Sequence, residues 1–288
     1  MAKTDCCTSF YLKNGLAQGS FCRLSDSITE SLNKHDYPPK INELLAELAV
    51  VSACFTAQIK SDFRATIQLT GAGPLKIALV DYKNNSFRCC ATFSNEKVLS
   101  DDRYDLLTVP ELFGKNSNLV FTIEFEGQRY QTVVGLQCQT LQECFYHYLL
   151  QSEQIDSLIL LNSKVSNNKV EAAALVLQKM PLFVNDTYYD IENTFWNDAK
   201  IFTATIKPTE LLAFEQDMSN LIYLVYNELS PIVSRETFLR FSCGCSKERL
   251  EKTASDLNIS PENLEKSLEI ICEYCGKKYF MDIYGKVS

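Results

Sequence analysis

The chain contains little histidine, little glycine or proline, and no long uninterrupted apolar run. Its 288 residues include two histidines, so serine–histidine or cysteine–histidine nucleophilic catalysis has little to work with. Ten glycines and eight prolines are roughly half of ordinary usage, which excludes collagen-like and low-complexity architectures. Hydrophobic residues make up 46% of the chain, enough to bury a core, so we expect a folded protein.

An excess of positive charge is also missing. The 28 lysines and arginines face 36 acidic residues, and a net charge of −8 disfavours nucleic acid as a partner. The apolar run from Leu44 to Ala57 is broken by Glu47 and is too short to cross a bilayer, so no membrane association is expected. The N-terminal residues carry Asp5 and no apolar segment after it, unlike a secretory signal, so we expect a cytoplasmic protein.

The segment 1–184 alternates between helical and strand patterns. The region from Phe10 to Ile28 is expected to form a strand pair or a loop. We expect helices over 43–57 and 141–154, and strands over 65–70, 75–80, 119–125, 130–136 and 172–178. Gly71–Pro74 would join two strands as a hairpin. The pattern predicts an α+β domain with an antiparallel sheet.

From position 185 the pattern changes to apolar residues at helical spacing, with few signs of an independent core. We therefore expect a helical linker over 185–242 whose order depends on docking against its neighbours. Five of its residues are candidates for both core packing and contact with other proteins: Phe195, Trp196, Phe202, Phe214 and Leu221. A third unit over 243–288 is too short to be stable without a staple.

Cysteine spacing supplies that staple. Twelve cysteines in a cytoplasmic protein are expected to be free thiols or metal ligands. The segment 246–271 separates a Cys-x-Cys pair, Cys243 and Cys245, from a Cys-x-x-Cys pair, Cys272 and Cys275. Four thiolates in two close pairs form a closed tetrahedral zinc site, so we expect one Zn²⁺ per chain.

Between the two pairs, the pattern predicts two short amphipathic helices. The first begins after Ser246, and the second begins at Ser260 and Pro261 and places Leu264, Leu268 and Ile271 on one face. A final strand is expected over 279–283.

The same cysteines also fit a redox switch. Gly244 lets the first pair direct both sulfurs at one metal or at each other. Four thiolates around zinc leave a net charge of −2, which Lys247, Arg249, Lys277 and Lys278 would offset. Zinc keeps the sulfurs as thiolates, the form that is oxidised.

This tail resembles the zinc-binding domain of the heat-shock protein 33 family, whose mark is a Cys-x-Cys pair followed further along the chain by Cys-x-x-Cys. Further similarity lies in the helix over 44–57 with the segment Ile67–Leu75 after it, in Gln139–Cys144 leading to Gln151–Gln154, and in Leu239–Cys243. The chain departs from the family in its eight additional cysteines: Cys6, Cys7, Cys22, Cys54, Cys89, Cys90, Cys138 and Cys144.

The resemblance implies an ATP-independent holdase chaperone, inactive when reduced and activated by oxidation, with the four tail cysteines as zinc ligands. It also implies disulfides Cys243–Cys245 and Cys272–Cys275 in the active form, unfolding client proteins as partners, and a monomer that dimerises on activation. If the linker packs against the folded tail, loss of the tail would free the apolar face over 211–225.

Two other classes of function compete with this interpretation. One is an enzyme or small-ligand protein with a purely structural zinc site, which the scarcity of histidine and of nucleophile or phosphate motifs disfavours. The other is a zinc-ribbon nucleic-acid binder, which the tail's near-balanced charge disfavours. We interpret Gly71–Gly73 as a turn and not a phosphate loop, Cys144 with His147 as packing and not a metal site, and His35 as isolated. The adjacent pairs Cys6–Cys7 and Cys89–Cys90 are interpreted as ordinary thiols.

Overall fold

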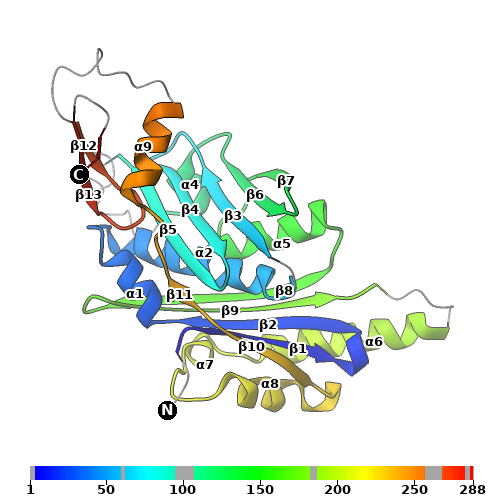
Figure 1. Cartoon of the computed structure of the whole chain (residues 1–288). Helices are drawn as coiled ribbons and strands as arrows, with labels where there is room; N and C mark the ends of the chain where they lie inside the picture. Colours follow the sequence, from blue (N-terminus) through cyan, green and yellow to red (C-terminus); the bar gives the residue numbers. More distant parts are fainter. Residues whose placement is uncertain are drawn as a thin grey trace.

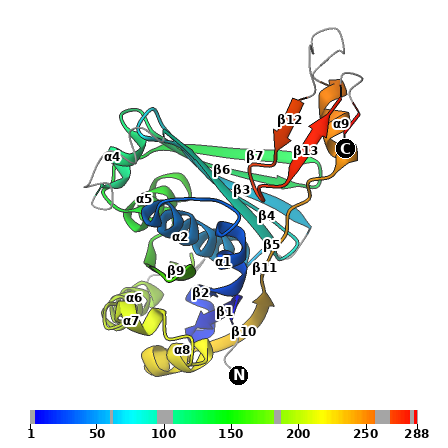
Figure 2. The same cartoon turned by 90° about the vertical axis from the view of Figure 1, so that its left-hand side faces the viewer.

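The computed structural model describes residues 4–59, 62–94, 107–181, 187–256, 268–282 and 286–287. Two β-sheets are stacked with helices between them, a further layer of helices covers the outside of one sheet, and a small tail unit stands at one side (Figures 1 and 2). This is the α+β architecture, with a helical segment and a small C-terminal unit, that the sequence predicts.

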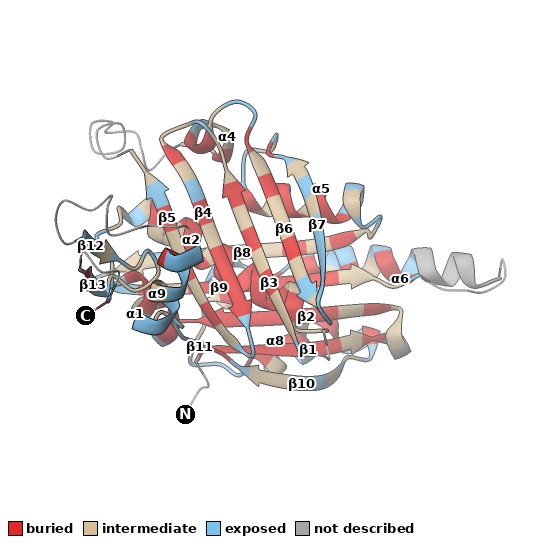
Figure 3. Cartoon of the chain, turned by 45° about the horizontal axis from the view of Figure 1, so that its top comes forward, coloured by how far each residue is buried: buried red, intermediate tan, exposed pale blue. Residues whose placement is uncertain are grey.

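The first sheet has strand order β10-β1-β2-β9-β8, with all neighbours antiparallel. Its strands are β1 (Cys6–Leu12), β2 (Ala17–Leu24), β8 (Ser157–Ser166), β9 (Lys169–Lys179) and β10 (Ile232–Phe238). Helices cover this sheet on each side, so its central strands are buried, whereas the edge strand β10 is largely exposed (Figure 3). Strands β1, β2 and β9 are consequently buried on both faces, where a half-exposed strand would alternate.

The second sheet has strand order β11-β5-β4-β3-β6-β7. Its strands are β3 (Phe63–Thr70), β4 (Leu75–Lys83), β5 (Ser86–Phe93), β6 (Asn118–Phe125), β7 (Gln128–Gly135) and the short β11 (Arg240–Phe241). The predicted antiparallel arrangement is confirmed except at β11, which pairs with β5 in parallel. The predicted hairpin at Gly71–Pro74 joins β3 to β4. A side chain at Gly71 would collide with the carbonyl of Phe113, so this glycine permits a close approach of two backbones.

Helix α2 (Pro39–Thr56) lies between the sheets and supplies the centre of the main core. Its neighbours in this layer are α1 (Asp26–Leu32), α4 (Val109–Phe113) and α5 (Leu141–Ser152), and the 3₁₀ turn Lys13–Gly15 joins β1 to β2. Thr140 caps α5 by accepting from the Glu143 amide, and the Glu143 carboxylate accepts from the Thr140 amide in return.

The linker contains α6 (Thr187–Ala204), α7 (Pro208–Leu211), α8 (Met218–Tyr226) and the 3₁₀ turn Asn227–Leu229, as helical spacing predicts. These helices cover the outer face of the first sheet, and their apolar side chains form a second core with Phe10, Phe21 and Leu175. These helices therefore pack against the first sheet and not against the tail, which the sequence left as a condition. The tail lies at the other side of the molecule, beside β5 (Figure 1).

Several strands differ from the sequence-based expectation. The sequence pattern does not predict β5 and β8, and the linker ends in two strands, β10 and β11, where only helices are expected. In the tail, α9 (Lys247–Asp256) and β13 (Lys278–Met281) agree with the predicted first helix and final strand. The predicted second helix is wrong at Leu268 and Ile271, which belong to β12 (Leu268–Ile271), paired with β13; Ser260, Pro261 and Leu264 lie outside the described residues.

Candidate metal centre

The first cysteine pair is positioned by the docking of β11 on the second sheet. Arg240 and Phe241 pair with Ser86 and Phe87 of β5, and the Ser242 amide donates to the Phe87 carbonyl at 3.0 Å. Cys243 follows directly after these backbone bonds. The body of the protein therefore fixes where the Cys-x-Cys turn begins.

The second pair lies in the turn between β12 and β13. The amides of Cys275 and Gly276 both donate to the Cys272 carbonyl, and the Cys272 amide donates to the Lys277 carbonyl at 2.9 Å. Gly276 has φ of 66°, in the left-handed region that glycine adopts without strain. These bonds fold the Cys-x-x-Cys segment into a tight knuckle with both sulfurs on one side.

The four predicted sulfurs meet in one cluster. All four Sγ atoms lie within 4.8 Å of one another, with Cys243 and Cys272 at 3.6 Å and Cys245 and Cys275 at 3.5 Å. Zinc bound by four thiolates at about 2.3 Å in a tetrahedron requires sulfurs about 3.8 Å apart. The donor set and its spacing therefore fit zinc. Among the described residues, no other group of cysteine, histidine and carboxylate side chains is close enough to share a metal.

Tyr279, on β13, is a neighbour of the cluster that no sequence pattern indicates. Its hydroxyl donates to Cys245 Sγ at 3.2 Å. Burial alone would raise the pKa of Cys245, but the hydrogen bonds from Tyr279 and the adjacent thiols lower it to about 7. Burial raises the pKa of Cys243, so the four sulfurs are electrostatically unequal.

Arg88, on β5, is the second neighbour absent from the sequence-based site, and it joins the cluster to the body. Its guanidinium lies 4.0 Å from the centre of the Tyr274 ring, which belongs to the knuckle, and the nearby Cys243 sulfur favours the charged form of this guanidinium. The backbone at Gly276 also approaches the Lys34 carbonyl so closely that a Cβ there would lie 2.9 Å from it. No sequence pattern connects Arg88 to the cysteines, because the contact exists only through the docking of β11 beside β5.

The four cations predicted near the cluster are used in different ways. Arg249 donates to the Gly244 carbonyl at 3.4 Å, and the Lys277 ammonium lies 4.9 Å from the Tyr279 ring centre. Lys278 is paired with Glu269 at 2.8 Å, and so part of its charge is neutralised by that carboxylate. Lys247 is exposed at the start of α9.

The linker residues singled out in the sequence lie far from the cluster, four of them in the second core and Phe214 beside Arg23 of β2. Phe195 and Trp196 on α6 and Leu221 on α8 are buried, whereas Phe202 and Phe214 are half-buried. Trp196 Nε1 donates to an oxygen of Asp156 at 2.6 Å. The structure thus gathers four of these residues against the first sheet, places Phe214 beside Arg23 of that sheet, and places none of the five beside the cysteines.

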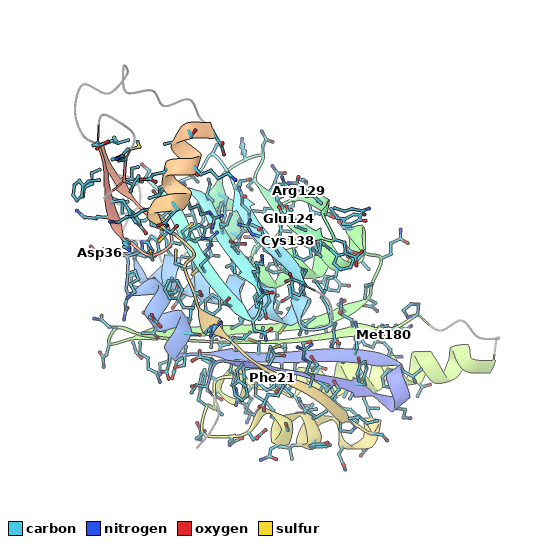
Figure 4. All side chains as sticks on the ribbon, viewed as in Figure 1. Phe21, Asp36, Glu124, Arg129, Cys138 and Met180 are labelled. Atoms are coloured by element: carbon cyan, nitrogen blue, oxygen red, sulfur yellow. The ribbon has the colours of Figure 1, made fainter. Side chains whose placement is uncertain are left out.

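The linker is attached to the sheet by Arg23, which sequence reasoning did not single out. Its side chain is buried on β2 beside Phe21 and donates to the carbonyls of Leu211, Gln216 and Glu210 at 2.7, 2.7 and 2.8 Å. Burial lowers the pKa of Arg23 to about 10, so the guanidinium is still charged at neutral pH. The sequence does carry one signal for this residue, because Arg23 is a charged side chain between apolar neighbours in a strand. Figure 4 labels Phe21, two residues before it.

The eight additional cysteines are free thiols, and most are buried in the body. Cys7 and Cys22 are opposite one another on β1 and β2, and Cys54 of α2 packs over them. Cys144 and His147 have no third ligand near enough to complete a metal site among the described residues. No helix in the described part of the chain is long and apolar enough to cross a membrane.

Comparison with known proteins agrees with this geometry. The family model described as Hsp33 protein matches residues 5–282. The 33 kDa chaperonin of Histophilus somni is 34% identical over 95% of this chain and 93% of its own length, and that of Actinobacillus succinogenes is 31% identical over 95% and 92%. The crystal structure of the 33 kDa chaperonin from Thermotoga maritima superposes with a TM-score of 0.80 at 16% identity, over 98% of this chain and 96% of that one. The chain therefore belongs to the Hsp33 family, a family of chaperones and not of enzymes.

Proposed function

We propose that this protein is an ATP-independent holdase that is inactive when reduced and zinc-bound and that oxidation activates. One observation carries the proposal. The four thiols converge in a tail that touches the body through β5, and the chain segment entering the cluster continues directly from β10 and β11, the two strands at the end of the linker. A change at the cysteines therefore has a covalent and hydrogen-bonded route to the linker.

Cys243, Cys245, Cys272 and Cys275 are the proposed ligands of one Zn²⁺. When bound, zinc supplies positive charge that keeps all four sulfurs as thiolates. Tyr279 orients Cys245 through a hydrogen bond from its hydroxyl, and Arg88 contacts the knuckle through the ring of Tyr274. Each disulfide forms when two thiols give two electrons to an oxidant such as hydrogen peroxide, which leaves as two waters.

The energy balance favours unfolding of the oxidised tail. Structural zinc contributes roughly 10–16 kcal/mol to folding at neutral pH. Disulfides that close loops of three and four residues return only about 2 kcal/mol each. The tail also has a small core of its own, formed chiefly by Ala254, Tyr279, Met281 and Val287. Oxidation therefore removes most of what stabilises this unit.

Loss of the tail would act on the linker through β11 and β10. Strand β11 is two residues long and is held by the backbone bonds of Arg240 and Ser242 to the β4–β5 hairpin and by Leu239, which is buried in the main core just before it. Strand β10 pairs with β1 at the edge of the first sheet and is half-exposed over much of its length. We infer that release of β11 weakens β10 and then the helices α6–α8, which exposes the second core.

The surface that would be exposed is apolar on both sides of the interface. The linker contributes Phe195, Trp196, Leu211, Met218, Leu221 and Ile222, and the first sheet contributes Phe10, Leu12, Phe21, Leu175 and Leu177. Burial of apolar area is non-directional, so such a surface suits unfolding clients of many sequences. In this proposal the five linker candidates act as packing residues in the reduced state and as client-binding residues in the oxidised state.

The disulfides proposed for the active form are Cys243–Cys245 and Cys272–Cys275. The sulfur contacts at 3.6 and 3.5 Å join members of different pairs, so distance in the reduced cluster does not select the partners. The family resemblance and the short loops within each pair support the proposed connectivity. Peptide mapping after peroxide treatment checks it, and a majority of Cys243–Cys272 and Cys245–Cys275 cross-links would contradict it.

The remaining parts of the proposal concern the division of the chain, which the change in sequence pattern supports, and the oligomeric state and location, which the family resemblance supports. The functional units are 1–184 as the body, 185–242 as the redox-sensitive linker and 243–288 as the switch. The protein is a cytoplasmic monomer when reduced and a homodimer when oxidised.

The test is suppression of client aggregation, measured by light scattering with reduced, peroxide-oxidised and absent protein, alongside zinc content. Oxidised protein should suppress aggregation without ATP after releasing one zinc per chain, and reduced protein should not. Zinc retained after all four ligands are oxidised or blocked, or equal activity in both states, would refute the proposal. Cys243→Ser should lower zinc affinity and loosen the tail even in reductant, whereas Cys90→Ser, outside the four, should leave zinc content unchanged.

A further inference from the structure

A basic pocket of about 340 Å³ lies where the body meets the segment that enters the cysteine cluster. Arg64, Lys83 and Arg88 line it from the second sheet, on β3, β4 and β5. Arg240 of β11 and Arg249 of α9 line it from the other side. The pocket exists because β11 docks beside β5 and carries the start of the tail over the open edge of this sheet.

The lining of this pocket holds a single carboxylate, that of Asp81. Its two oxygens are shared by Arg64 at 2.7 and 2.9 Å and by Arg88 at 2.7 and 2.8 Å. Glu124, outside the lining, reaches Arg64 more loosely, at 3.9 Å. The negative charge at the pocket is therefore committed to two of its five cations.

The remaining three cations of the pocket are Lys83, Arg240 and Arg249, of which Arg249 also contacts the Cys-x-Cys turn and helps to offset the charge of the thiolates there. Among the described residues, no carboxylate lies within ion-pair distance of Lys83, Arg240 or Arg249. This positive cluster belongs to a chain whose net charge is −8. Such a local excess attracts anions against the repulsion of the whole protein.

We propose that this pocket binds a small anion bearing two or more phosphate groups. Arginine side chains present planar sets of donors that match phosphate oxygens, and the Ser242 hydroxyl adds a neutral donor at the rim. The volume is at the lower end of small-molecule sites, which suits a diphosphate or triphosphate group. A nucleic acid would require basic residues along several successive phosphates, and the charge here is confined to one hollow.

An anion in this pocket would join the body to the tail. Its ligands on one side belong to strands of the body, and Arg240 and Arg249 flank the first cysteine pair in sequence. Binding would stabilise the docked tail because the contacts exist only while β11 is paired with β5. If the proposed redox function is correct, the bound anion also delays activation; the binding itself does not depend on that function.

The test uses the reduced, zinc-loaded full chain and inorganic pyrophosphate as the probe. Isothermal titration calorimetry at about 150 mM salt, where exposed charges are screened beyond about 8 Å, should give saturable binding of one pyrophosphate per chain. Arg240→Gln and Lys83→Gln should each weaken binding about tenfold, since each removes one charge-assisted contact. Arg129→Gln is the matched control, because Arg129 is exposed on β7 of the same sheet outside the pocket (Figure 4) and should change binding less than twofold.

Four outcomes would overturn the site. They are no binding at this salt concentration, equal weakening by the control variant, equally tight binding of sulfate, or displacement of pyrophosphate by a tighter-binding single-stranded RNA. Zinc content is measured after each titration, because heat that accompanies zinc loss in every variant would report metal chelation and would also overturn it.

The bridging role has its own measurement. Pyrophosphate should slow hydrogen exchange of the Ser242 and Leu250 amides in the wild type and not in Arg240→Gln. If pyrophosphate binds but hydrogen exchange of these two amides does not change, the anion does not join the body to the tail. That result would leave the proposed holdase function untouched.

Discussion

Replacing Arg23 by methionine should release the linker from the first sheet while leaving the cysteine cluster intact. The Arg23 guanidinium donates to three carbonyls of the linker, at positions 210, 211 and 216, and the residue is 1% exposed. It also lies 4.8 Å from the centre of the Phe21 ring and 5.7 Å from that of Phe214. Methionine fills a similar apolar volume but donates no hydrogen bond.

The magnitude follows from these contacts. A hydrogen bond from a charged donor contributes about 1.5–3 kcal/mol, so three would sum to about 4–9 kcal/mol. Two of the three bonds are only part-buried, so water recovers some of this in the variant. We expect a net loss of about 3–5 kcal/mol in linker docking, which raises the open fraction of the linker by about a hundredfold to a few thousandfold. The core around α2 does not contain Arg23 and should keep its stability.

The assay combines hydrogen exchange, zinc content and suppression of client aggregation, all in reductant. Exchange should accelerate at the Phe214 and Gln216 amides, which bond within the linker, and stay slow in α2 and β9. The reduced variant should suppress aggregation with one zinc still bound. Arg129→Met, at an exposed position on β7, is the control and should behave as the wild type. A zinc-replete Arg23→Met protein that is inactive, with native exchange throughout 187–229, would show that linker release does not activate the chaperone.

Three further predictions concern other contacts. Leu221→Asn places an amide in the second core, where Leu221 is 4% exposed, so linker docking should be weakened by about 2–4 kcal/mol. The variant should then suppress aggregation in reductant with zinc bound, and Phe214→Asn should do so more weakly. Aggregation assays that find both variants inactive, with slow hydrogen exchange in the linker, would refute this. Burial alone would raise the pKa of Asp81, but the guanidinium groups of Arg64 and Arg88 hold it below its ordinary value of 3.8. The ionised carboxylate therefore stabilises the fold above that pH, and its contribution is lost as the pH falls through the pKa of the folded state. Asp81→Asn should therefore lower the unfolding free energy by about 3 kcal/mol at pH 7 and by much less near pH 3, and a loss in urea unfolding that is independent of pH would contradict the ion-pair interpretation. Tyr274→Ala removes the ring beside Arg88 and with it a cation–π contact of about 0.5–2 kcal/mol. Proteolysis of the tail in reductant should therefore become faster. An unchanged cleavage rate would show that the knuckle is held by other contacts.

Local pattern was sufficient for much of the body. Helix α2 and the β3–β4 hairpin have the apolar spacing and turn residues that predict them, because each buries a face whose period is visible in a short window. The apolar run of β9 likewise predicts a strand. Strand β5 escapes prediction because polar Arg88 and the two cysteines Cys89 and Cys90 obscure its alternation, and β8 because its outer positions are only half-buried.

The sequence did not show which part of the protein the linker docks on. The helical spacing over 211–225 predicts an apolar face but does not state its partner, and the partner proved to be β1, β2 and β9 and not the tail. Strand β10 escapes prediction because strand formation there depends on a free edge at β1, which lies near the opposite end of the chain. Arg23 is similar, since its three acceptors are carbonyls that only the folded linker brings to it.

The sequence by itself determined the identity of the four sulfurs, the ion they suit and the family. Two close cysteine pairs constrain their own sulfurs locally, and the donor chemistry of four thiols is a property of residue type. Only the tertiary structure decided what surrounds them. Tyr279 reaches the cluster through the fold of the tail, in which β13 pairs with β12. Arg88 and the basic pocket reach it through the parallel pairing of β11 with β5, and such pairing between distant segments depends on the packing of the whole body, which no short window of sequence contains.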